Sequence, residues 1–250
     1  MNEPRRRAVA RRSTSDRYFH VAAAFVMLAV MLAGFYPFYL RGEGMAGRKI
    51  APALLPLVVV HGSAMAAWVA IFLVQSLLVP TRMLRLHMKL GWAGIAVAFL
   101  AATTGVWVAV QSVRPIPELP FWGMEYRQFL AVMLAEMALF TAFVIAGVLS
   151  RKKPRVHRAM MLLATLSILA GATVRMPVLF PLFGEAGWVG VFGPIFALGG
   201  ALVLVRRLAV GTLERWLVGG YAVMVALYVV ACWFAVSDAW RAIARVILDT

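Results

Sequence analysis

The run FLAVMLAEMALFTAFVIAGVL, residues 129–149, contains 21 residues, and Glu136 is its one charged side chain. An α-helix needs about 20 apolar residues to cross the hydrocarbon core of a bilayer. Six other runs of comparable length lie along the chain: Phe19–Leu40, Pro52–Val79, Leu90–Val110, Met160–Leu182, Trp188–Val205 and Trp216–Val236. Each run is continuous rather than alternating in polarity, which is typical of a membrane helix and not of a barrel strand. The sequence therefore predicts an all-α fold, a polytopic bundle of seven transmembrane helices.

The composition favours a membrane protein without a soluble domain. Of the 250 residues, 63% are hydrophobic, and the mean hydropathy is +0.87, whereas soluble domains are about half apolar. The longest segment between runs, residues 111–128, is too short to fold as a domain. We therefore expect a basic tail over residues 1–18, a transmembrane domain over residues 19–236 and a short amphipathic segment over residues 237–250.

The distribution of positive charge predicts an orientation in the membrane. The net charge is +15, and 17 of the 25 Lys and Arg residues lie in the N-terminal tail and in every second loop, on one side of the predicted membrane. This asymmetry follows the positive-inside rule with a cytoplasmic N-terminus and, after seven helices, a C-terminus outside. The basic loops explain the charge without nucleic acid as a partner. The expected partners are the lipid bilayer and anionic lipid head groups at the cytoplasmic face.

The last segment has its own pattern. Trp240, Ile243, Ala244 and Ile247 recur at helical spacing, with charged residues mostly on the other faces. The pattern predicts either a short helix on the outer membrane interface or a continuation of the last transmembrane helix.

Three ionisable side chains lie inside the apolar runs: His61, Glu136 and Arg175. Such residues are costly in a membrane and are often functional. His61 and Glu136 each lie nine residues beyond the outer start of a run, roughly 13 Å deep, and Gln75 follows His61 on the same helical face. A Glu136–Arg175 pair with His61 nearby predicts either a polar clamp that fixes helix packing or a proton relay or quinone-facing ligand site.

Two histidines at the cytoplasmic ends of separate helices form a second candidate site. Arg85-Leu86-His87 and Arg155-Val156-His157 are 70 residues apart in a faint internal repeat, which predicts equal depth for His87 and His157. Two imidazoles from separate helices can ligate a haem iron from both faces, and Arg85 and Arg155 can pair with its propionates. The pair therefore predicts a haem b site, with the iron as its metal. The alternative is that these residues only anchor the helix ends at the interface.

Several stretches resemble an uncharacterised family of bacterial multi-pass membrane proteins. They are HGSAM at residues 61–65 with Gln75 further on, LHMKLGW at residues 86–92 and VHRAMMLLAT at residues 156–165, together with the acid in the fourth run. The resemblance implies a bacterial inner-membrane location and supplies no activity. The placement of the histidines is also loosely similar to that of membrane b-type cytochromes.

These patterns lead to one main functional hypothesis and two alternatives. The main hypothesis is a haem-binding or electron-transfer membrane protein, for which quinone is one candidate partner. The alternatives are a proton-coupled transporter or sensor in which Glu136 and His61 titrate, and a structural or assembly factor. No cluster of Cys and His residues has the spacing of a zinc site, and no residue is assigned a catalytic role.

Overall fold

The computed structural model describes residues 3–45, 48–176, 178–179 and 187–249. Within these residues, seven helical segments are long and apolar enough to cross a membrane, which confirms the predicted all-α fold. Their helices are α1 (Glu3–Arg41), α2 (Leu55–Leu78), α3 (Leu84–Val113), α4 (Tyr126–Leu149), α5 (Pro154–Ser167) with α6 (Ala170–Thr173), α8 (Trp188–Val210) and α9 (Arg215–Ala235).

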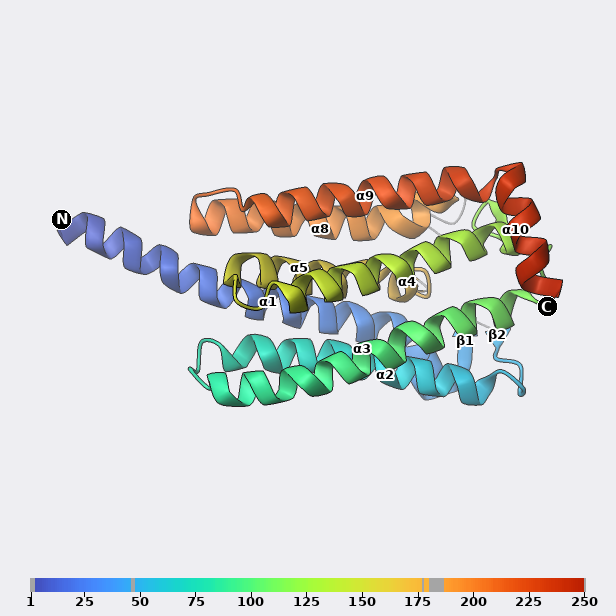
Figure 1. Cartoon of the computed structure of the whole chain (residues 1–250), viewed down its shortest axis with the longest axis horizontal. Helices are drawn as coiled ribbons and strands as arrows, with labels where there is room; N and C mark the ends of the chain where they lie inside the picture. The colour runs from blue at the N-terminus through green and yellow to red at the C-terminus, as the bar shows by residue number, and fades with distance from the viewer. Residues whose placement is uncertain (1–2, 46–47, 177, 180–186, 250) are drawn as a thin grey trace.

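The spanning helices run antiparallel to one another along the chain, so the connections gather at two ends of the bundle (Figure 1). One end carries the turns between α2 and α3, α4 and α5, and α8 and α9, and we call it the basic end. The other end, the hairpin end, carries two short hairpins, β1 (Glu43–Met45) with β2 (Arg48–Lys49) and β3 (Pro120–Phe121) with β4 (Met124–Glu125). Helix α10 (Asp238–Asp249) lies at this same end.

The core is built around α4 and α5. Helix α4 packs against α3, α5 and α9, and α5 is the most buried of the spanning segments. By contrast, large apolar side chains on other helices are exposed, among them Trp92 (74%), Phe99 (71%) and Trp233 (77%). Exposed apolar faces of this extent are unfavourable in water and favourable in lipid. The bundle therefore has the surface of a multi-pass membrane protein.

The fifth spanning segment differs from the prediction of one helix over Met160–Leu182. It begins earlier, at Pro154, where a proline at the first position suits a helix start. It is interrupted after Ser167 by a turn and resumes as α6 for four residues. The prediction of one unbroken helix was wrong because hydropathy reports apolar length and not backbone continuity. Leu182 lies outside the described residues.

The ends of other helices also extend beyond the apolar runs. Helix α3 begins at Leu84 instead of Leu90, and α8 continues to Val210. The first helix already begins at Glu3, so the basic tail is continuous with the first spanning segment. Lys and Arg residues are accommodated at the ends of membrane helices because their long side chains extend toward water.

The C-terminal segment is a separate helix and not a continuation of α9. Residues 236 and 237 separate α9 from α10, and α10 turns across the hairpin end of the bundle (Figure 1). The Ser237 Oγ accepts a hydrogen bond from the Trp240 backbone N–H at 3.1 Å. Trp240 and Ala244 are buried against the bundle, as their helical spacing indicated.

Candidate functional site

The structure brings His87 and His157 together at the basic end. His87 lies in the first turn of α3 and His157 in the first turn of α5. Their ring centroids are 6.3 Å apart, and their ring planes are inclined by 80°. Both side chains are half-buried. The two histidines therefore lie at equal depth, as the 70-residue repeat predicts, and their rings are also close to each other.

Both rings are oriented by main-chain carbonyl groups. The Nδ1 of His157 donates to the carbonyl oxygen of Gly147 at 2.8 Å, and the Nδ1 of His87 lies 3.4 Å from that of Gln75. A carbonyl oxygen only accepts, so Nδ1 carries the hydrogen in each contact and the Nε2 lone pair stays available. Histidines that ligate metals are oriented in this way. In both hairpins the carbonyl belongs to the last turn of the preceding helix, α2 or α4.

Gln75 belongs to this site and not to the site around His61. Its Nε2 donates to the carbonyl oxygen of His87 at 3.0 Å. Together with the contact of His87 Nδ1 with the Gln75 carbonyl oxygen, this bond links the two residues in both directions. The Oε1 of Gln75 is buried and has no hydrogen-bond partner. The shared helical face of His61 and Gln75 was a correct geometric relation, but 14 residues of helix separate them by roughly 21 Å.

Arg85 and Arg155 are both exposed. Arg155 lines a shallow pocket at the basic end together with His20, Arg158 and Arg206. Residues two positions apart on a helix do not face the same way, and Arg155 is two positions before His157. A role for the two arginines at propionates stays a prediction.

In the half of the bundle toward the hairpin end, His61 of α2 is hydrogen-bonded to helix α3. The Thr104 hydroxyl donates to the carbonyl oxygen of Leu100 at 2.6 Å, and His61 Nδ1 lies 3.2 Å from the same Thr104 Oγ1. Since the hydroxyl proton is already used, His61 Nδ1 is the donor to Thr104. A Cβ at Gly105 would lie 2.9 Å from His61 Cε1, so that glycine makes room for the ring.

Glu136 lies beside the interruption between α5 and α6, where its carboxyl group interacts with the backbone of Gly171. The hydroxyl of Tyr228, a buried residue of α9, donates to the carbonyl oxygen of Ser167 at 2.5 Å. Interrupted helices persist at membrane depth only where protein groups pair the freed backbone atoms. Sequence analysis missed Tyr228, which reads as one more aromatic residue in an apolar run.

Arg175 follows α6, and its hydrogen bonds go to main-chain carbonyl oxygens. Its Nε donates to Gly44 at 2.9 Å, its Nη1 donates to Gly171 at 2.5 Å, and its guanidinium lies 5.2 Å from the Phe35 ring centroid. Among the ion pairs between described residues, none joins Arg175 to Glu136 within 4.0 Å. Arg175 still interacts electrostatically with both Glu136 and His61, so the predicted trio shares one region without a direct ion pair.

An ion network at the basic end was not predicted from the sequence. Asp16 of α1 pairs with Arg158 of α5 at 3.0 Å and with Arg206 of α8 at 2.8 Å. Arg206 is the most buried cation of the network, with 8% of its side chain exposed. One signal for the network was available, because Asp16 is one of only three acidic residues in the basic segments.

The network predicts a pH dependence of stability. Burial alone would raise the pKa of Asp16, but the guanidinium groups of Arg158 and Arg206 outweigh it and hold the pKa below 3.8. A carboxyl whose pKa is lowered in the folded state stabilises the protein above its unfolded pKa, and this contribution is lost as the pH falls through the folded value. We expect Asp16→Asn to lower the free energy of unfolding by about 2 kcal/mol at neutral pH, and by progressively less as the pH falls below 3.8 and through the lowered pKa of Asp16.

The measurement is thermal unfolding in detergent, followed by tryptophan fluorescence, at a series of pH values. Asp238→Asn is the matched control, because Asp238 is 92% exposed and its pair with Arg241 spans three residues of one helix. That control should change stability by less than about 0.5 kcal/mol. If the stability of the wild type and of Asp16→Asn changed with pH in parallel, the pH dependence could not be assigned to Asp16.

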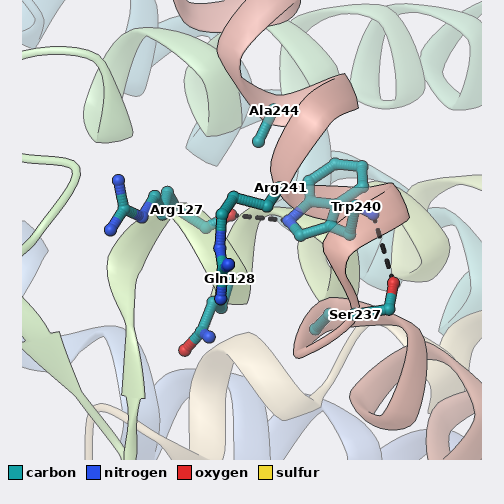
Figure 2. Close-up of a pocket in the computed structure, with 7 residues that line it drawn as sticks. Arg127, Gln128, Ser237, Trp240, Arg241 and Ala244 are labelled. Atoms are coloured by element: carbon teal, nitrogen blue, oxygen red, sulfur yellow. Dashed lines mark hydrogen bonds between the residues drawn. The ribbon is translucent and has the colours of Figure 1, made fainter.

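A second shallow pocket lies at the hairpin end, between α4, α9 and α10, and is drawn in Figure 2. The Trp240 indole Nε1 donates to the backbone carbonyl oxygen of Arg127 at 2.9 Å, while the guanidinium of Arg127 points away from the indole (Figure 2). That guanidinium pairs with Glu125 at 2.5 Å. The pocket has room for about one water molecule and is a docking contact of α10.

Comparison with known proteins does not assign a family. No family model, curated protein or solved structure matches the chain. Among the described residues, no group of three or more His, Cys, Asp or Glu side chains is arranged to hold a metal ion. The candidate site at the basic end therefore rests on two imidazoles and the groups that orient them.

Proposed function

We propose that the protein is a membrane electron-transfer protein that holds one haem b between His87 and His157. The observation that carries the proposal is the approach of these two rings from separate helices, each with Nδ1 on a carbonyl oxygen. Two imidazoles in line with a metal, with metal–nitrogen bonds of about 2 Å, have ring centres roughly 6 Å apart. The observed separation is 6.3 Å.

The donor set favours haem over a bare metal ion. Zinc takes four ligands in a protein site, whereas a haem iron already has four porphyrin nitrogens and needs two axial ligands. In the part of the chain that the structure describes, no group of three or more His, Cys, Asp or Glu side chains is arranged to hold a metal ion, which leaves the two imidazoles as the donor set. Gly91 and Gly94 of α3 pack against Gln75 and Ile71 of α2, so haem would bind between the two rings only in a conformation in which α2 and α3 have moved apart at this end.

Each part of the chain has a role in this proposal. When bound, haem supplies reversible one-electron chemistry. His87 and His157 would ligate the iron, the carbonyl groups of Gln75 and Gly147 would hold the rings in place, and Arg85 would be the candidate partner of a propionate. Glu136, with His61 and Arg175, is the proposed proton or quinone-facing site toward the hairpin end.

An absorption spectrum of the detergent-purified protein, produced with haem supplied, tests the proposal. We expect a sharp Soret band at about one haem per chain, with a shift on reduction that is typical of six-coordinate iron. A folded, monodisperse protein without a Soret band would contradict it.

The interrupted helix favours a second candidate, a proton-coupled transporter or sensor. Discontinuous helices frequently form the substrate and ion sites of transporters, and Glu136 lies at the interruption between α5 and α6. In that case Glu136→Gln should abolish uptake or ligand-induced stabilisation in haem-free protein. An unchanged response in Glu136→Gln would exclude this role for the carboxylate.

We further propose that the protein lies in a bacterial cytoplasmic membrane with its basic end inside. The support is the excess of Lys and Arg at that end. A reporter fused after Thr250 should be active outside the cytoplasm, and cytoplasmic activity would reverse the orientation.

A further inference from the structure

The pocket at the basic end is built by residues from four helices. Its polar lining consists of His20 of α1, Arg155 and Arg158 of α5, Arg206 of α8 and Glu214, which caps α9. It has room for about one water molecule, so one phosphate oxygen fits inside while the rest of the phosphate and of a larger ligand lies on the surface.

The charges around the pocket leave an unbalanced cation. Asp16 pairs with both Arg158 and Arg206, and the Glu214 carboxylate accepts from the backbone N–H groups of Trp216 and Leu217 at 3.3 and 2.9 Å. Three guanidinium groups thus face two carboxylates, with a net charge of +1.

Of the three arginines, Arg155 is the one outside the ion network, so its guanidinium can bind a ligand. It is exposed, and among the described residues no ion pair or side-chain hydrogen bond is seen for it. Arg158 and Arg206 also keep donors in reserve, because each guanidinium has five N–H groups and the network uses only some of them.

The pocket lies at the level of the membrane where lipid head groups are found. Arg155 and Arg158 belong to the first turns of α5, and Arg206 to the last turns of α8. Next to them, Arg215 lies over the ring of Trp216 at 5.0 Å, and tryptophan is enriched at membrane interfaces.

We propose that this pocket binds the phosphodiester of an anionic phospholipid whose head alcohol is uncharged, such as phosphatidylglycerol. A phosphodiester carries one negative charge, which balances the excess of one cation among Arg155, Arg158, Arg206, Asp16 and Glu214. Guanidinium groups bind phosphate oxygens by charge-assisted hydrogen bonds. A phosphatidylcholine head group places a cation beside three arginines and is disfavoured. The inference does not depend on haem.

Native mass spectrometry of the haem-free full-length chain tests the site, with phosphatidylglycerol and phosphatidylcholine of identical acyl chains. We expect phosphatidylglycerol to bind at one copy per chain and at least about tenfold more tightly than phosphatidylcholine. Arg155→Gln should weaken phosphatidylglycerol binding by about tenfold. Lys152→Gln is the matched control, since it removes one positive charge from the same exposed segment without touching the pocket, and it should change binding by less than about threefold.

Competition with inorganic phosphate separates a lipid site from a site for a free anion. Phosphate at millimolar concentration should leave the bound lipid in place. Equal binding of the two lipids, equal weakening by the two variants, or displacement by phosphate would each overturn the proposal. If Arg155→Gln fails to fold, the comparison of the two lipids on the wild type still decides the outcome.

Discussion

Replacing His157 with alanine is expected to lower the haem affinity of the protein by more than about 100-fold and to abolish the six-coordinate spectrum. The reason is that an axial ligand is lost outright, and even groups that only orient a metal ligand contribute 10- to 100-fold to affinity. His87→Ala should behave alike, because the two rings flank the same point at 6.3 Å between centroids. The measurement is the haem content per chain and the absorption spectrum after purification.

The chain supplies its own control for this experiment. His61 is also half-buried in a spanning helix, but it hydrogen-bonds to Thr104 toward the other end of the bundle. His61→Ala should therefore retain the Soret band at the wild-type haem content. Equal losses in all three variants would mean that general destabilisation, and not ligation, explains the effect.

Gly34→Ala is expected to destabilise the bundle by about 3 kcal/mol. A Cβ at this position of α1 would lie 2.6 Å from both the Cα and the carbonyl carbon of Ala172 in α6 and would also overlap its carbonyl oxygen. These are backbone atoms, so α1 and the interrupted segment must move apart, which also disturbs the contact between Phe35 and Arg175.

The measurement is the free energy of unfolding in detergent micelles. Gly219→Ala in α9 is the control, because a Cβ there meets nothing within 4 Å, and alanine is favoured over glycine in a helix by about 0.5–1 kcal/mol. Unchanged stability in Gly34→Ala would show that α1 does not pack closely against α6.

Local patterns in the sequence were sufficient for the fold and for part of the site. Apolar runs of spanning length predicted seven helices, because each helix is stabilised by its own segment in lipid. The repeat predicted that His87 and His157 lie at equal depth. The helical spacing predicted the helix α10, but of its apolar face Trp240 and Ala244 are buried against the bundle whereas Ile243 is 44% exposed.

What the sequence could not show depends on contacts between distant segments. The carbonyl of Ser167 is paired by Tyr228, 61 residues away, and Arg206 is paired by Asp16, 190 residues away. No run of residues encodes such pairings. The interruption after Ser167 is equally hidden, because no proline or glycine lies in the turn at residues 168 and 169 and the freed carbonyl oxygen of Ser167 is paired from α9.

Electron paramagnetic resonance of the oxidised, haem-loaded protein tests the central claim most directly, because the signal reports how many strong axial ligands the iron has. Two imidazoles from α3 and α5 predict a low-spin ferric signal, strongly anisotropic if the ring planes keep their inclination of 80°. That signal should disappear in both His87→Ala and His157→Ala. A high-spin signal in the wild type, or a low-spin signal that survives in either variant, would contradict the account.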